Sequence, residues 1–364
     1  MRICFIGSKN IFIYNFAKYY IEKKGFEVFL ITRSKRNFTN EDFGFIKIFY
    51  LKSERLPYKI IRIRNIIKQI KPDVVHCFYI SRDAIAPCLF YNRKFKYVCS
   101  IFGSDIYWDM NNNSKRWLKY LVLRKCDVIT CNSFQMEKDL LRRFPQLPPD
   151  KIKPIMWGIN FDLFNRVDSK AIQKKKQELG IGNEKVILSY RGFSPVYNQE
   201  IIFKAIPLVL DHNKDLKFIF ILGNTKISEI QPLISLLNPD IIANNVIFIE
   251  KFLSYEELST FLNLSDIVIN IPKTDQFALS LLETMASRAI PILSNISVYR
   301  DVLKEYENAI FLHEINEYEL ASKIIYVIDN YDILSSKIIF NNNLIVKTNF
   351  NFHLQTEKMI SLYN

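Results

Sequence analysis

The sequence predicts an α/β protein built from two doubly wound parallel sheets. Short β-branched and aromatic runs alternate with helical patterns along the chain, which is the order expected of βαβ units. The chain has 364 residues, more than one hydrophobic core usually holds, and suits two domains of about 150 to 200 residues. A stretch rich in Pro and Gly separates two sets of these runs.

The elements expected in the first half begin at the N-terminus. Strands are expected at Ile3–Ile6, Val28–Thr32, Ile46–Tyr50, Val74–Cys77, Tyr97–Ile101 and Val128–Cys131, and helices at Ile13–Lys24 and Tyr58–Ile70. The second half repeats the pattern. Its expected strands are Val186–Tyr190, Lys217–Leu222, Val246–Ile249, Ile267–Ile269 and Ile290–Leu293, and its expected helices are Lys170–Gly180, Gln199–Leu210, Tyr255–Asn263 and Leu279–Ser287.

The expected linker lies between these two sets. It contains Pro145, Pro148 and Pro149 and continues through the Pro154–Phe164 segment. We therefore place the first domain at residues 1–165 and the second at 166–349, with a last helix at 350–364.

Composition limits the compartment and the chemistry. No apolar run reaches the ~18 residues of a membrane span, and the start lacks a signal-peptide pattern, so a cytoplasmic protein is expected. The six cysteines form no C-x-x-C pair and are interpreted as reduced structural thiols. The four histidines are scattered without metal-ligand spacing, so no metal site is predicted.

Positive charge is concentrated in the first domain. Residues 1–165 hold 30 Lys and Arg against 14 Asp and Glu, a net charge of +16, whereas residues 166–364 carry −3. Basic, helix-like stretches at 59–68 and 115–125 favour an anionic membrane surface or nucleic acid, with solvated helix faces as the alternative. No nucleic-acid-binding signature is present, so the membrane is the predicted partner.

Asp275 and Glu283 are the most informative pair. They lie eight positions apart across a loop-to-helix junction. The amides of Phe277, Ala278 and Leu279 between them would point at an anion bound at the helix N-terminus. This arrangement predicts a site for a sugar attached to a diphosphate, although a simple helix cap is the alternative.

Arg191 follows an expected strand of the second domain. A residue at the carboxyl end of a parallel strand faces the ligand crevice, where a guanidinium can bind a diphosphate bidentately. Tyr197 lies in the following turn and can hydrogen-bond a phosphate oxygen without adding charge. Lys273 is a second candidate cation, and a surface arginine in a turn is the alternative reading of Arg191.

Three first-domain candidates lie at or just after the ends of expected strands. Phe102-Gly103-Ser104-Asp105 follows the strand at 97–101, and Asp105 is either a cap on the following segment or a site carboxylate. His76 lies near a strand end and is either a structural hydrogen-bonding residue or a site residue. Gly7 follows the first strand and would let the backbone approach a ligand.

These motifs, in this order, resemble those of the retaining glycosyltransferases of family 4. The Asp275–Glu283 segment resembles the family's E-x7-E motif with Asp in place of the first Glu, and Phe102–Asp105 resembles its H-G-S-D motif with Phe in place of His. Trp157-Gly158-Ile159-Asn160 resembles the family's interdomain turn. The resemblance implies a GT-B fold, in which two Rossmann-like domains face a central cleft and the last helix packs back on the first domain.

The resemblance also implies the chemistry. A sugar would pass from a nucleoside diphosphate sugar to a hydroxyl with retention of configuration and without a metal or other cofactor. Glu283 would hold the ribose, Asp275 and the amides of Phe277 to Leu279 the sugar, and Arg191 the leaving diphosphate. Tyr197 stands where the family usually has a Lys, and Phe102, Gly103, Asp105 and His76 would lie on the acceptor side, with Gly7 near the donor phosphate.

The resemblance and the charge together predict a lipid-linked or other glycan acceptor, and peripheral association with the inner face of the cytoplasmic membrane. Two alternatives remain. One is a nucleotide-sugar 2-epimerase of the same fold, and the other is a noncatalytic partner of a transferase, which the replacements at Phe102, Tyr197, Asp275 and Arg288 would permit.

Overall fold

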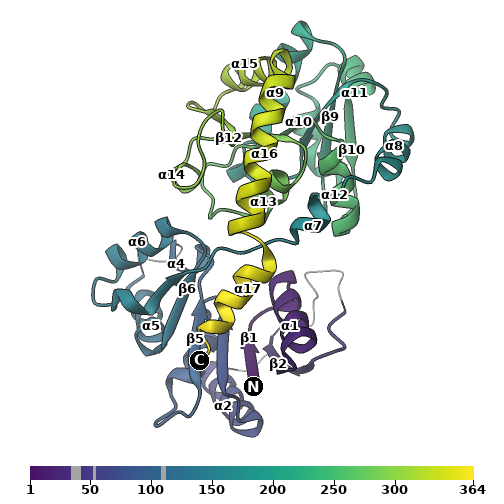
Figure 1. The fold of residues 1–364 in the computed structure, drawn as a ribbon. Coiled ribbons are helices and arrows are strands. Elements are labelled where there is room, and N and C mark those ends of the chain that lie inside the picture. Colours follow the sequence, from purple (N-terminus) through teal and green to yellow (C-terminus); the bar gives the residue numbers. More distant parts are fainter. Residues whose placement is uncertain (34–41, 52–54, 108–111) are drawn as a thin grey trace. The chain divides into compact units, whose positions relative to one another are not determined.

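A computed structural model of the chain describes residues 1–33, 42–51, 55–107 and 112–364. The chain forms two compact units (Figure 1). The first unit comprises Met1–Met156 and Thr356–Asn364, and the second comprises Trp157–Gln355. The expected boundary at residue 165 lies inside the second unit. The last helix, α17 (Phe352–Ser361), begins in the second unit and ends in the first.

The first unit contains a parallel sheet in the order β3-β2-β1-β4-β5-β6-β7. Its strands are β1 (Arg2–Ile6), β2 (Glu27–Thr32), β3 (Lys47–Tyr50), β4 (Val74–Phe78), β5 (Lys96–Ser100), β6 (Val128–Cys131) and β7 (Ile152–Pro154). The sequence indicated each of these except β7. That strand has three residues, too few to show an alternating pattern.

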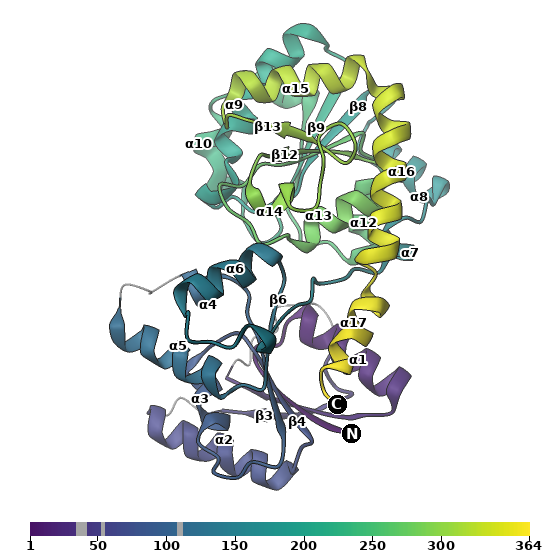
Figure 2. The same cartoon turned by 60° about the vertical axis from the view of Figure 1, so that its left-hand side comes forward.

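Helices cover both faces of this sheet (Figure 2). They are α1 (Ile11–Lys24), α2 (Leu56–Ile70), α3 (Ile85–Cys88), α4 (Ser104–Tyr107), α5 (Asn113–Lys125) and α6 (Phe134–Arg143), with short 3₁₀ segments η1 (Arg82–Ala84) and η2 (Pro149–Lys151). Apolar residues of α2, α3, α5 and α6 share one core cluster with the sheet. The end of the chain packs near α1, where the Tyr20 and Tyr363 hydroxyls are 3.1 Å apart.

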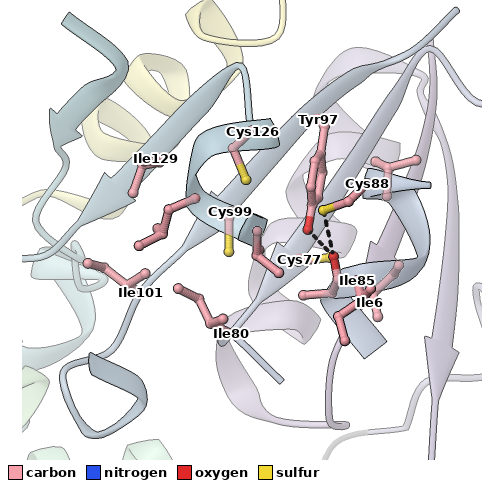
Figure 3. Close-up of a cluster of buried hydrophobic side chains, with 14 of the residues drawn as sticks. Ile6, Cys77, Ile80, Ile85, Cys88, Tyr97, Cys99, Ile101, Cys126 and Ile129 are labelled. Atoms are coloured by element: carbon pink, nitrogen blue, oxygen red, sulfur yellow. Dashed lines mark hydrogen bonds between the residues drawn. The ribbon is translucent and has the colours of Figure 1, made fainter. Parts of the chain in front are cut away.

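All six cysteines are buried free thiols, as the sequence indicated. Figure 3 shows four of them among the isoleucines of the first unit's core. The Tyr97 hydroxyl and the Cys88 thiol both donate to the Ala84 carbonyl, at 2.6 and 3.4 Å. Burial raises the pKa of the Cys4 and Cys88 thiols, so these side chains are core residues and not nucleophiles.

The second unit contains a parallel sheet in the order β10-β9-β8-β11-β12-β13. Its strands are β8 (Lys185–Ser189), β9 (Leu216–Ile221), β10 (Val246–Ile249), β11 (Ile267–Asn270), β12 (Ile290–Ser294) and β13 (Ile310–Leu312). The sequence pattern did not predict β13, which again has three residues. The prediction of two parallel α/β sheets is confirmed.

The second unit's helices connect and cover these strands. They are α7 (Phe161–Phe164), α8 (Ser169–Glu178), α9 (Gln199–His212), α10 (Gln231–Ile234), α11 (Pro239–Asn245), α12 (Tyr255–Leu264), α13 (Leu279–Ala286), α14 (Ser297–Arg300), α15 (Glu317–Asp329) and α16 (Tyr331–Asn349), with 3₁₀ segments η3 (Pro195–Tyr197) and η4 (Ile227–Ile230). None of the helices in the described residues is long and apolar enough to cross a membrane.

Gly158 is required by close packing at the start of the second unit. The Ile159 amide donates to the Phe350 carbonyl at 3.0 Å, and the Phe352 amide donates back to Ile159 at 2.8 Å. A Cβ at position 158 would lie 2.6 Å from the Phe352 Cα. Only glycine permits this approach, because real Cβ atoms do not come so near to backbone atoms.

Candidate functional site

The candidate donor site lies at the topological switch point of the second sheet. The strand order reverses between the neighbours β8 and β11, and ligands of open α/β sheets bind at the carboxyl ends of such strands. Arg191 follows β8, and Asp275 follows β11. The fold therefore brings together two residues that are 84 positions apart in sequence.

Arg191 is held by two contacts from the loop and helix that follow β11. Its Nη1 lies 3.0 Å from Asp275 Oδ2 and donates to Ser280 Oγ at 2.6 Å. The two charged side chains are only 12% and 10% exposed. Burial by itself would lower the pKa of the guanidinium, but the Asp275 carboxylate and the Tyr197 and Tyr299 hydroxyls together outweigh it, and the pKa is raised. Arg191 is thus a fixed, permanently charged group.

Asp275 has a second partner that the sequence did not reveal. The Tyr299 hydroxyl, which α14 positions, donates to Asp275 Oδ2 at 2.6 Å. The Gln276 amide donates to the other oxygen at 2.8 Å. The carboxylate is therefore orientated by a cation, a phenol and a main-chain amide.

Helix α13 begins directly after this carboxylate. Ala278 is its N-cap residue, and no side-chain hydrogen bond caps this end within the described residues. Phe277 just before it has a left-handed backbone with φ of 55° and is buried against Phe350 and Tyr299. The buried ring holds the loop in this strained turn, and the first amides of α13 remain suited to an anion.

Glu283 lies on the inner side of α13 and is buried. Burial raises the pKa of its carboxyl to about 7, although the Tyr190 hydroxyl and the Arg191 guanidinium act in the opposite direction. The Tyr190 hydroxyl donates to the Ser280 carbonyl and lies 3.4 Å from Glu283 Oε2. A buried carboxyl that titrates near neutral pH is typical of a functional site.

Tyr197 and Lys273 occupy different surroundings. The Arg191 Cζ lies 4.4 Å from the centre of the Tyr197 ring, so the two groups form a cation–π pair. Lys273 is exposed and lines a pocket of about 770 Å³ together with Phe193, Asn198 and Gln199. Its ammonium is not among the groups that contact Arg191 in the described residues.

The first unit has its own switch point, between β1 and β4. Asp105 is buried near it, and its two oxygens accept from the amides of Ile80 and Phe102, each at 3.0 Å. Burial raises the pKa of this carboxyl, and the two amides oppose the shift. Asp105 thus ties the turn after β4 to the turn after β5, where Gly103 has a φ of 97°. This geometry favours a positioning role, and direct catalysis by Asp105 stays a prediction.

His76 lies inside the first unit and is fully buried. Its Nδ1 lies 2.7 Å from Tyr363 Oη, and its Nε2 lies 2.7 Å from Ser100 Oγ. Burial lowers the pKa of the imidazole to about 3, so the ring is neutral at physiological pH. Of the two interpretations of the sequence, the geometry favours the structural histidine.

Gly7 and Phe102 are explained by packing. A Cβ on Gly7 would lie 2.8 Å from Ile13 Cδ1 and 3.2 Å from Phe78 Cβ. The Phe102 ring, where the motif usually has a histidine, packs edge-on against Phe12 with centroids 5.5 Å apart. Roles of these two residues toward ligands stay predictions.

Two family models match the chain. One is described as Glycosyl transferases group 1 and covers residues 171–343, and the other is described as Glycosyltransferase Family 4 and covers residues 10–163. The chain belongs to glycosyltransferase family 4. An uncharacterized glycosyltransferase of Methanocaldococcus jannaschii is 24% identical over 263 residues, 69% of this chain and 65% of that protein. The chain thus spans less than two thirds of this relative's length.

Solved structures show the fold of this family 4 protein. A glycosyltransferase from Rickettsia africae superposes with a TM-score of 0.84 at 18% identity, covering 100% of this chain and 97% of the other. Anabaena HepE in complex with UDP superposes with a TM-score of 0.80 at 15% identity, covering 100% and 99%. These structures have the GT-B fold, so the predicted fold class is confirmed. The predicted family resemblance is confirmed by the two family models.

Three residues that make contacts in the candidate site were not predicted from the sequence: Tyr190, Ser280 and Tyr299. Tyr190 and Ser280 had weak signals, because each lies beside or within a motif already identified. Tyr299 had none, because only the neighbouring position of β12 in the sheet brings α14 to Asp275.

The described residues also contain no group of three or more His, Cys, Asp or Glu side chains able to hold a metal ion.

Proposed function

We propose that this chain is a retaining glycosyltransferase that moves a sugar from a nucleoside diphosphate sugar to a hydroxyl of a lipid-linked glycan. The observation that carries the proposal is the Arg191–Asp275 pair at the start of α13, 3.0 Å apart and nearly buried. The pair places a permanent cation beside the N-terminus of α13, where no side-chain hydrogen bond caps the helix in the described residues. An arginine next to uncapped helix amides is an environment suited to a diphosphate.

A UDP-sugar is the proposed donor. The related HepE was crystallised with UDP, with UDP and glucose, and with UDP-glucose. In this chain Glu283 lies one turn inside α13, where its carboxylate would accept hydrogen bonds from the ribose hydroxyls. Asp275 and the amides of Phe277, Ala278 and Leu279 would bind the sugar.

Leaving-group stabilisation rests on Arg191. Its guanidinium and the dipole of α13 would offset the charge that develops on the departing phosphate. Tyr197 adds a hydroxyl and supports the guanidinium from one side, and it adds no charge. Since Lys273 does not contact Arg191, we assign it a secondary role toward the phosphates.

The reaction that we propose needs no metal and no dedicated protein base. The bond between the anomeric carbon and the phosphate oxygen breaks, and the acceptor oxygen bonds to that carbon on the same face. The acceptor proton passes to the departing phosphate oxygen. The nucleoside diphosphate and the glycosylated acceptor are the products, and the anomeric configuration is retained.

The acceptor side is assigned to the first unit, with Phe102, Gly103 and Asp105 at the ends of β5 and α4. A lipid-linked acceptor is proposed because the excess positive charge of the chain lies in residues 1–165. Such acceptors serve the synthesis of surface polysaccharides and glycoconjugates, which is the process that we propose for this enzyme.

Two experiments test the function. In a thermal-shift panel of UDP, GDP, ADP and their sugars, we expect stabilisation by the uridine compounds, because a ligand that binds only the folded state raises its stability. Turnover of the stabilising donor is then measured with and without a lipid extract. Acceptor-dependent transfer supports the proposal, isomerisation without acceptor identifies an epimerase, and binding without turnover identifies a noncatalytic partner.

A further inference from the structure

Three helices form one layer on the first unit's sheet. Helix α3 contacts both α2 and α5, and the three helices lie on the same side of the sheet (Figure 2). Buried residues of all three belong to one core cluster with the sheet. On α2, Ile63, Ile66, Ile67 and Ile70 point to the sheet. The opposite side of this layer, which we call the basic face, is defined by Tyr58, Ile61, Lys68, Tyr91, Lys94 and Trp117.

The basic face carries large apolar side chains that are exposed. Tyr58 is 65% exposed, Tyr91 in the turn after α3 is 92% exposed, and Trp117 on α5 is 62% exposed. Tyr58, Ile61 and Lys68 follow one another at helical spacing of three and seven residues, so they lie on one side of α2. Exposed aromatic and aliphatic residues thus come from three segments of one layer.

The same segments carry only positive charge. Residues 55–71 contain six Lys and Arg, residues 88–96 contain three and residues 112–126 contain five, and none of these segments contains Asp or Glu. Acids flank the segments in sequence, at Glu54, Asp73 and Asp127, and Asp127 forms an ion pair with Arg93. Because the segments themselves contain no acid, each of them has a positive net charge.

This combination fits an anionic lipid surface better than other partners. Lys and Arg are attracted to anionic headgroups, and Tyr and Trp rings favour the interface between headgroups and acyl chains. Nucleic acid would use the charges and aromatic rings, but it offers no apolar phase for an aliphatic side chain such as Ile61, which is 54% exposed.

We infer that the basic face is the surface by which this protein docks on an anionic membrane. Apolar side chains of α2, the turn after α3 and α5 enter the interface, and the surrounding lysines and arginines hold the headgroups. The inference rests on the proposed function only in bringing the enzyme to a lipid-linked acceptor. Docking itself is a property of the first unit and is measured without donor or turnover.

Vesicle co-sedimentation of the full chain tests the inference. We expect binding to phosphatidylglycerol vesicles, no binding to phosphatidylcholine vesicles, and release by high salt, because charge screening removes the attraction. The double variant Lys68→Ser/Lys94→Ser should weaken binding by up to about fivefold for each lysine. Trp117→Ala and Tyr58→Ala should weaken it at both low and intermediate salt.

Matched controls come from the second unit. Lys170→Ser/Lys174→Ser removes two exposed lysines of α8, and Tyr318→Ala removes an aromatic ring that is 70% exposed. Both should bind vesicles like the unchanged protein. Absence of binding at low salt, equal losses in the control variants, or retention of a DNA duplex in place of vesicles would each overturn the inference. UDP binding is measured on the same samples. A protein that binds UDP but not the vesicles contradicts the docking inference and leaves the proposed function intact.

Discussion

The Tyr299 hydroxyl donates to the Asp275 carboxylate at 2.6 Å, on the same oxygen that pairs with Arg191. Burial raises the pKa of Tyr299 well above its usual value, and the Asp275 carboxylate adds to the shift, so the phenol stays protonated. One carboxylate oxygen is therefore shared by a phenol and a guanidinium. This sharing fixes the position of the cation before any donor binds.

Removing this phenol tests the shared oxygen. Tyr299→Phe should destabilise the second unit by about 1 to 3 kcal/mol, because a buried hydrogen bond to a charged group is lost. The measurement is denaturant unfolding of the variant, of Asp275→Asn and of the double variant. If the two changes add without interaction in this cycle, the hydrogen bond does not contribute to stability.

Arg191→Ala should reduce turnover by about 10²-fold or more with the fold intact, as is typical for loss of one preorganised stabiliser. The comparison variants are Arg191→Lys, which keeps a charge without the planar fork, and Arg166→Ala, an exposed arginine of the second unit. A loss below about tenfold would mean that another cation, such as Lys273, neutralises the leaving group.

Glu283 predicts a pH dependence of donor binding. Its carboxyl is protonated below about pH 7 and ionised above it. The ionised form is the stronger acceptor for ribose hydroxyls, so affinity should fall as the pH drops through this value. Calorimetry with UDP-glucose is suitable, because both phosphates are esterified and do not titrate near neutral pH.

Glu283→Gln is the control for this titration. It should weaken binding by about 1 to 3 kcal/mol at high pH and show no dependence on pH around 7. Equal affinity of the variant and the unchanged protein at high pH would remove Glu283 from the donor site. A pH dependence that persists in the variant would assign it to another group.

Tyr363→Phe should loosen the first unit. His76 Nδ1 would lose its partner, and the Tyr20 hydroxyl would lose its contact with Tyr363. An unpaired buried polar group costs about 1 to 3 kcal/mol. Hydrogen–deuterium exchange of β1 and β4 under mild denaturant measures the effect, and Tyr58→Phe serves as the exposed control. Unchanged protection would show that this buried network does not anchor the chain's end.

The sequence by itself determined the α/β class, the order of the longer strands and the positions of the motifs. Short apolar runs identify β1, β8 and β11, because parallel strands that are buried on both faces are apolar along their whole length. The same runs also locate Arg191 at a strand end, because every parallel strand delivers its next residues to the same edge of the sheet. The three-residue strands β7 and β13 gave no such signal.

Only the tertiary structure decided which groups touch and which titrate near neutral pH. The neighbouring positions of β8, β11 and β12 bring Arg191, Asp275 and Tyr299 together, and strand order is not encoded in any local pattern. Burial behind α13 raises the pKa of Glu283 to about 7, whereas burial in the sheet keeps His76 neutral. The residues next to Glu283 and His76 in sequence do not indicate these pKa shifts. The shifts arise from desolvation, which depends on how distant segments of the chain pack around each group.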